Sequence, residues 1–149
     1  MKVIQEVFGQ INNQTVNSFT LVNNHGLELT CINYGCVITK IITPDNKGNF
    51  ENIVLGYDTL KEYLDGRYFF GTVVGRVAGR IKGGSFELDG NIFTLAKNEN
   101  NNHLHGGNKG FDKVLWDTSV TESDEVASVQ FSYLSPDGEE GYPGNVNVK

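Results

Sequence analysis

Two arginines and two histidines in the middle of the chain are the side chains best suited to recognising a polar ligand. Arg76 and Arg80 lie four residues apart in an apolar, glycine-spaced run, and His103 and His105 flank a leucine just before Gly106-Gly107. The planar guanidinium of arginine suits adjacent hydroxyls or a carboxylate, and a neutral imidazole both donates and accepts hydrogen bonds. These residue types predict a polar-ligand site.

The arginines also have ordinary interpretations. An arginine is usually a surface residue or the partner of a carboxylate at the edge of the core. The neighbours of this pair are apolar, however, and a guanidinium among apolar residues needs polar partners because an unpaired buried charge is costly. In a strand, Arg76 and Arg80 would share one face because their spacing is even. Surface, structural and ligand-binding roles therefore stay open at this point.

The spacing of the two histidines places both rings on one side of an extended chain. A His-x-His pair can bind metal, but the sequence offers no clear third and fourth ligand, so we expect no metal site. Gly106-Gly107 after His105 predicts open backbone that a ligand can approach closely. The acidic residues Asp137, Glu139 and Glu140 lack the spacing of a calcium loop, and we expect a solvated turn there.

Composition places the chain among ordinary globular domains. Its 149 residues suit one domain. The chain has 12 basic and 18 acidic residues, so it lacks the excess of basic residues that a nucleic-acid-binding surface needs. It has no apolar run of membrane-spanning length and no signal-peptide core at its start, so we predict a cytoplasmic protein without nucleic-acid or membrane partners. Cys31 and Cys36 fit buried thiols in a reducing compartment better than a redox pair.

The apolar residues mostly follow the two-residue period of strands. With 18 glycines and only three prolines, the chain has the many tight turns of an all-β protein. Phosphate-binding glycine motifs and a G-x-S-x-G nucleophile motif do not occur. The predicted strands are 16–22, 27–32, 37–43, 52–57, 85–88, 91–95, 114–120, 126–134 and 145–149.

Two local signals predict particular elements. Asp89-Gly90 is a preferred two-residue hairpin loop, and its register places Phe86 opposite Phe93. Thr59 followed by Glu62 is a capping box, which predicts one short structural helix near 59–65.

Short motifs spread along the whole chain occur together in one order. They are Asn33-Tyr34-Gly35, Pro44-Asp45, Asn52 to Tyr57, Gly75-Arg76-Val77-Ala78-Gly79-Arg80-Ile81, Phe86-x-Leu88-x-Gly90, Asn98, His103-Leu104-His105-Gly106-Gly107, Gly110-Phe111-Asp112, Trp116 and Ser135 to Gly144. In this order they resemble the amino-terminal half of the aldose 1-epimerases, also called galactose mutarotases. Eight or more motifs in sequence make coincidence implausible.

The resemblance implies both a fold and an activity. The fold is an all-β, antiparallel β-sandwich of the galactose mutarotase type, of which residues 1–149 form the amino-terminal part, roughly the first half of a single domain. Family members interconvert the α and β anomers of free aldohexoses such as galactose and glucose, without a cofactor. A base takes the proton of the C1 hydroxyl while an acid protonates the ring oxygen, so that the ring opens and closes again.

The resemblance also assigns site residues. Arg80 matches a sugar-binding arginine, and His105 matches the His-Gly-Gly histidine, which implies sugar binding and an auxiliary catalytic role near the reacting oxygens. Gly79 stands where many members carry a sugar-binding asparagine, so only its backbone can contribute. We expect Arg80 and His105 to face one cleft and Arg76 to make a structural pairing.

The family's principal acid and base are not among these residues. The acid is a histidine in an Asn-His motif and the base is a late glutamate, and both are expected beyond residue 149. We therefore expect the isolated polypeptide to be inactive, and to be poorly soluble or to self-associate through an exposed sheet edge. Alternatives are a non-catalytic sugar-binding or regulatory relative, and a structural or interaction module.

Overall fold

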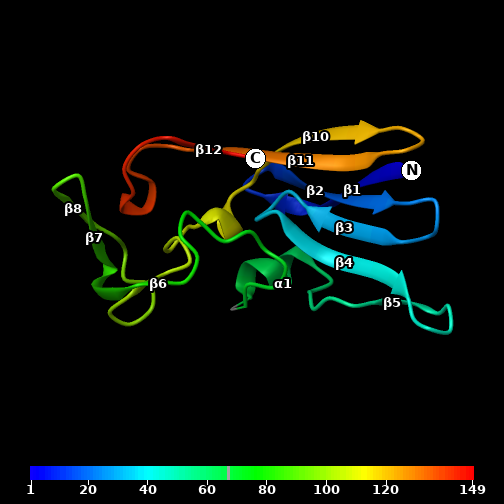
Figure 1. Cartoon of the computed structure of the whole chain (residues 1–149), viewed down its shortest axis with the longest axis horizontal. Coiled ribbons are helices and arrows are strands. Elements are labelled where there is room, and N and C mark those ends of the chain that lie inside the picture. The colour runs from blue at the N-terminus through cyan, green and yellow to red at the C-terminus, as the bar shows by residue number, and fades with distance from the viewer. Residues whose placement is uncertain (67) are drawn as a thin grey trace.

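Five antiparallel strands from the first third of the chain form the larger sheet. In this computed structural model, which describes residues 1–66 and 68–149, neighbours in sequence are neighbours in the sheet (Figure 1). The strands are β1 (Lys2–Ile11), β2 (Gln14–Val22), β3 (Glu28–Ile32), β4 (Val37–Pro44) and β5 (Phe50–Asn52).

A second antiparallel sheet comes from the last third of the chain. Its order is β10 (Asp117–Glu122), β11 (Ala127–Ser135) and β12 (Val146–Val148). Figure 1 shows β10 and β11 running alongside the β1–β2 edge of the first sheet. Phe19 on β2 is fully buried and meets Phe131 on β11 edge to face, with 6.1 Å between ring centroids. The predicted all-β, antiparallel sandwich-like architecture is confirmed.

The middle third connects the sheets and carries the candidate site. Figure 1 shows the β6–β8 region projecting from the end of the molecule opposite to the β5 and β10–β11 turns. Within it, β6 pairs with β9 and β7 pairs with β8. The elements are α1 (Leu60–Asp65), β6 (Arg80–Ile81), β7 (Ser85–Leu88), β8 (Asn91–Thr94), β9 (His103–Leu104), and 3-10 turns at Lys82–Gly84, Phe111–Lys113 and, later, Glu139–Gly141.

The core has two apolar clusters joined through the β3–β4 connection. In that connection Gly35 donates to the carbonyl of Val114 (2.9 Å), and Trp116 donates to the carbonyl of Asn33 (2.8 Å). The segment leading from the candidate site into β10 is thereby fixed to the first sheet. The first cluster contains Val16, Ile32, Tyr34, Val37 and Leu60, and the second contains Cys36, Phe111, Val114 and Trp116.

Both local signals in the sequence are confirmed. Asp89 and Gly90 have φ of 51° and 76°, and Phe86 pairs with Phe93 in the ladder. The two rings stack at 5.4 Å. Thr59 caps α1, with the capping box complete in both directions.

The predicted strand at 52–57 is wrong, and the side chain of Asn52 explains why. Its Oδ1 accepts from the backbone N–H of Ile41 (3.0 Å) and of Val54 (3.3 Å), and its Nδ2 donates to the carbonyl of Val54 (3.1 Å). The Asn52 amide thus replaces backbone partners for Ile41 and Val54, as asparagine does in turns, and the ladder does not continue beyond the bond from the Ile53 N–H to the Ile41 carbonyl. The strand expected at 114–120 begins later, at Asp117.

The strand β1 was not predicted from the sequence. A bulge between Val7 and Gly9 interrupts its alternation, so no regular period marks this strand. Gly9 is needed there because a Cβ would press into the side chain of Leu60 on α1.

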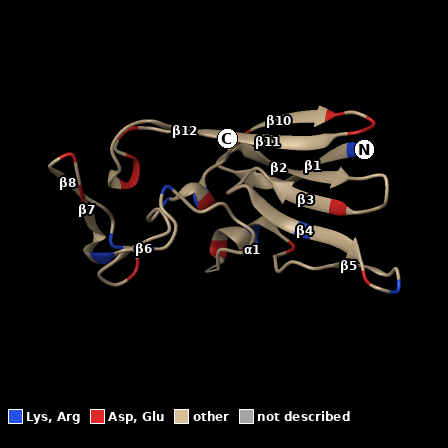
Figure 2. Ribbon diagram, viewed as in Figure 1, with Lys and Arg blue, Asp and Glu red and all other residues tan. Residues whose placement is uncertain are grey.

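Both cysteines are free and buried, as predicted. Burial raises the pKa of the Cys31 thiol to about 11 and that of Cys36 to about 12, which keeps both protonated at neutral pH. Figure 2 shows Lys and Arg scattered among Asp and Glu along the ribbon. In the part of the chain that the structure describes, no helix has the length and apolarity needed to cross a membrane.

The cap of α1 gives a direct test of the fold. Replacing Thr59 by Ala removes the acceptor for the Glu62 N–H (3.4 Å), and we expect the free energy of unfolding to fall by about 1 kcal/mol. Urea titration followed by circular dichroism measures the change. Thr59→Ser keeps the hydroxyl and is the control. Equal losses in both variants would contradict the capping role.

Candidate functional site

The candidate site is built on the short β6–β9 ladder. Arg80 pairs with Leu104, and Ile81 pairs with His103. One residue beyond, the His105 N–H donates to the Gly79 carbonyl, and the Gly79 N–H donates to Nδ1 of His105, both at 3.0 Å. Gly79 has a φ of +82° and His105 one of +52°, so the chain turns at both positions.

These bonds fix the protonation pattern of the His105 ring. Because Nδ1 accepts the Gly79 N–H, the proton of the neutral imidazole lies on Nε2. No group in residues 1–66 or 68–149 bonds to this Nε2. The edge of Phe69 packs against the imidazole, with 4.7 Å between ring centroids. A half-buried histidine is thus oriented from two sides and keeps one N–H donor for a ligand.

His103 is structural, and the expectation that both histidines point the same way is wrong. It is fully buried, with Nδ1 2.8 Å from the Ala96 carbonyl and Nε2 2.7 Å from the Tyr142 hydroxyl. Because a carbonyl only accepts, Nδ1 carries the proton and Nε2 accepts from Tyr142. The two rings point in different directions because the chain turns at His105. His103 and His105 are therefore opposite tautomers.

Arg80 is held by the carboxylate of Glu99, which no motif in the sequence marks. Its Nε and Nη2 donate to Oε2 and Oε1 of Glu99 at 3.0 and 2.8 Å, a bidentate pair. The hydrogen bond from Arg80 lowers the pKa of Glu99, and the same bond raises the pKa of Arg80. The Arg80 side chain is 59% exposed. Glu99 therefore orients a guanidinium that remains accessible to a ligand.

Arg80 and Gly79 are sequence neighbours: Arg80 lies on the β6–β9 ladder, and Gly79 bonds to His105 one residue beyond it. That Arg80 and His105 reach one ligand stays a prediction, as does a direct sugar contact by Gly79, whose N–H and carbonyl already bond to His105. A Cβ on Gly79 would meet open space, so the asparagine expected at this position from the resemblance would fit there. Asparagine also tolerates positive φ better than most residues.

Arg76 makes the structural pairing that we expected. Nε donates to Oγ of Ser135 (2.8 Å), Nη1 to the carbonyl of Pro143 (3.0 Å), and Nη2 to the carbonyls of Ser135 (3.1 Å) and Pro136 (2.7 Å). The guanidinium also lies over the Tyr142 ring, 5.8 Å from its centroid. Four bonds to one loop identify Arg76 as the anchor of that loop.

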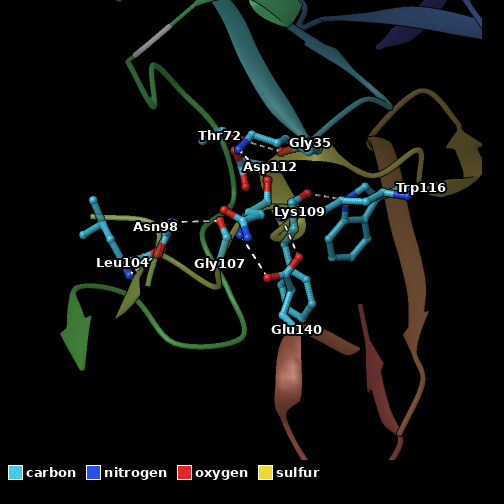
Figure 3. Close-up of polar contacts among 12 residues, drawn as sticks. Gly35, Thr72, Asn98, Leu104, Gly107, Lys109, Asp112, Trp116 and Glu140 are labelled. Carbon is cyan, nitrogen blue, oxygen red and sulfur yellow. Dashed lines mark hydrogen bonds and ion pairs between the residues drawn. The ribbon is translucent and has the colours of Figure 1, made fainter. Parts of the chain in front are cut away.

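Asn98 holds the loop that follows β9. Its Oδ1 accepts from Leu104 N–H (2.8 Å), and its Nδ2 donates to the carbonyls of Leu104 (2.9 Å) and Gly107 (3.0 Å). Figure 3 shows this amide beside Leu104 and Gly107. The signal available in the sequence was the amide-rich run before Gly106-Gly107, because asparagine side chains often replace backbone partners in loops.

A cavity of about 390 Å³ is lined by this loop and by Phe69, the ring that packs against the imidazole. Leu104, Gly107, Asp112 and aromatic residues line it, but neither Arg80 nor His105 does. Burial raises the pKa of Asp112, whose Oδ1 has no bonding partner in the described part of the chain. Within those residues, no group of three His, Cys, Asp or Glu side chains is placed to hold a metal ion.

Comparison with known proteins gives the family. The aldose 1-epimerase family model matches residues 17–149. The chain is 46% identical to galactose mutarotase of Bos taurus and 45% identical to that of Homo sapiens, and these matches cover 99% and 98% of the chain. It is 32% identical to maltose epimerase of Levilactobacillus brevis. The chain belongs to the aldose 1-epimerase family.

Solved structures agree with this assignment. The crystal structure of galactose 1-epimerase from Lactobacillus acidophilus matches with a TM-score of 0.85 at 32% identity over 98% of the chain. An aldose epimerase homologue from C. elegans matches with a TM-score of 0.79 at the same identity. The chain spans only 42% of the length of these mammalian mutarotases, and the same share of the Lactobacillus protein.

The opposite tautomers of His103 and His105 can be measured. Multiple-bond ¹⁵N–¹H correlation spectra should show the proton of His103 on Nδ1 and that of His105 on Nε2, because of their partners Ala96 and Gly79. His25→Gln removes the third, exposed histidine and assists assignment. An Nδ1–H tautomer at His105 would contradict the reciprocal bond with Gly79.

Proposed function

We propose that the protein is an aldose 1-epimerase that interconverts the anomers of a free aldohexose, galactose or glucose, without a cofactor. In this proposal residues 1–149 are the amino-terminal part of a single sandwich domain and supply Arg80 and His105 to the sugar site. The observation that carries the proposal is the His105 imidazole, fixed by Gly79, whose neighbour in sequence is the accessible Arg80. The galactose mutarotases among its relatives support the same reaction.

The two side chains suit different parts of this reaction. Ring opening takes a proton from the C1 hydroxyl and gives one to the ring oxygen, so negative charge develops on oxygen. An oriented Nε2–H of His105 stabilises such an oxygen by hydrogen bonding. The guanidinium of Arg80, held by Glu99, fixes adjacent hydroxyls and so the position of the ring.

We assign the principal acid and base to residues outside these 149. His103 is fully buried, and both its nitrogens are bonded to groups of the core. Glu140 accepts hydrogen bonds from the backbone of the His-Gly-Gly loop. Neither side chain is free to transfer protons to a sugar, which supports the assignment.

Mutarotation assays test the proposal. Followed by polarimetry on fresh α-D-galactose and α-D-glucose, the 149-residue polypeptide should not exceed the buffer rate, and the full-length gene product should. In that product we expect His105→Gln and Arg80→Ala each to lower kcat/KM by about 100-fold. His25→Gln is the matched control for His105→Gln.

Two outcomes would count against the proposal. Turnover by the 149-residue polypeptide would show that acid and base lie within it. Sugar binding by the full-length product without turnover would favour a non-catalytic, sugar-binding relative.

We also propose that the 149-residue polypeptide associates with itself and resides in the cytoplasm. Its two buried thiols are free, as in reducing compartments. An apolar groove of about 470 Å³ runs beside β12, lined by Trp116, Phe131 and Val148 among others. The strand β12 is paired only with β11, so its outer edge is open in the described part of the chain. Open edges and apolar grooves promote pairing between copies.

Size-exclusion chromatography with light scattering measures this association. We expect oligomers at micromolar concentration, and we expect Val146→Lys on the edge strand to shift the population toward monomer. Asn46→Lys adds the same charge in an exposed turn and should leave the distribution unchanged. A monodisperse monomer would show that the chain closes its own core.

A further inference from the structure

We propose that Glu140 is a positioning residue for His105. Its carboxylate binds the backbone just after the His-Gly-Gly motif, opposite the side held by Asn98, and so fixes the imidazole in place. The consequence for catalysis rests on the proposed function, but the contact itself does not.

The contact uses both oxygens of the carboxylate. Oε2 accepts from the N–H of Asn108 (2.9 Å) and Oε1 accepts from the N–H of Lys109 (2.8 Å). Figure 3 shows Glu140 reaching the Gly107–Lys109 backbone from one direction while Asn98 contacts it from another. Hydrogen bonds to an ionised carboxylate are stronger than bonds between neutral groups, so the loop is firmly held.

The two glycines of the motif make this close approach feasible. Gly106 and Gly107 are buried, with φ of +88° and +105°. A Cβ on Gly107 would collide with the Glu140 carboxylate, and one on Gly106 would collide with the carbonyl of Gly75. The expectation that these glycines leave open backbone for a ligand is therefore wrong, because protein groups already occupy that space.

Glu140 is in turn held by the rest of its loop. Arg76 binds the carbonyls of Ser135, Pro136 and Pro143, and the Tyr142 hydroxyl donates to buried His103. Because these partners fix both ends of the segment, it is a bound element and not the solvated turn expected from the sequence. Through the Glu140 side chain this segment binds the backbone just after the His-Gly-Gly motif, 32 residues away in sequence.

A merely structural carboxylate would also stabilise the fold, so the test must report on His105. Three variants are compared. Glu140→Ala removes both acceptors, Glu140→Gln keeps one oxygen, and Glu87→Gln makes the same charge change on exposed β7.

The first measurements are the amide hydrogen exchange of Asn108 and Lys109 and the ¹⁵N shifts of the His105 ring, which require no activity. Glu140→Ala should accelerate exchange by about 10-fold or more and move the His105 signals, with Glu140→Gln intermediate and Glu87→Gln unchanged. Unchanged amides and ring signals in Glu140→Ala would overturn the proposal.

The kinetic arm uses the full-length gene product. Glu140→Ala should lower kcat/KM by about 10- to 100-fold, because a small displacement of a positioned group is costly. In a double-mutant cycle, adding Glu140→Ala to His105→Gln should have little further effect, since the glutamate acts through the histidine. Additive losses would overturn the positioning role. Absence of mutarotation in the unmodified full-length product would instead refute the proposed function and leave the exchange and ring measurements to decide on Glu140.

Discussion

The reciprocal pair of hydrogen bonds between Gly79 and His105 is the interaction on which the site depends. It requires positive φ at both residues, which is rare for a residue other than glycine, asparagine, aspartate or histidine. The pair extends the two-residue ladder of β6 and β9, which by itself is too short to hold a loop firmly. It also decides the tautomer of the imidazole, and therefore whether the available nitrogen donates or accepts.

The rest of the middle region supports this pair from several sides. Asn98 and Glu140 bind the backbone that follows β9, and Glu99 orients the guanidinium next to Gly79. Arg76 and His103 look like ligand-binding residues in the sequence, but their polar atoms bond to protein groups. Arg76 binds the loop that carries Glu140, and His103 bonds to Tyr142 in the core. Of two arginines and two histidines, one of each is therefore accessible for chemistry and the other supports it.

Elements set by local chemistry could be predicted from the sequence. The Asp89-Gly90 turn follows from the positive φ that both positions need, and α1 follows from a cap whose two partners lie three residues apart. The motifs in order also gave the family and the candidate pair Arg80 and His105. That Arg80 and His105 bind the same sugar molecule is part of the proposed function.

Features set by distant partners could not be predicted. The Glu140 contact joins residues 32 apart, and the Arg76 contacts join residues 59 to 67 apart, so no local pattern marks them. Likewise the strand expected beyond Asn52 ends because the side-chain amide of Asn52 accepts a hydrogen bond from Ile41 on the neighbouring strand. The sequence showed which groups need partners, but the fold decides which partners they meet.

We propose that Arg80 and His105 bind one sugar through the geometry set by Gly79. An NMR titration of D-galactose into the ¹⁵N-labelled full-length gene product tests it most directly. We expect the His105 Nε2–H, the Gly79 amide and the Arg80 side-chain signals to shift along one saturation curve, while the ring of buried His103 stays unchanged. Saturable binding that leaves the His105 and Arg80 signals unmoved would contradict it.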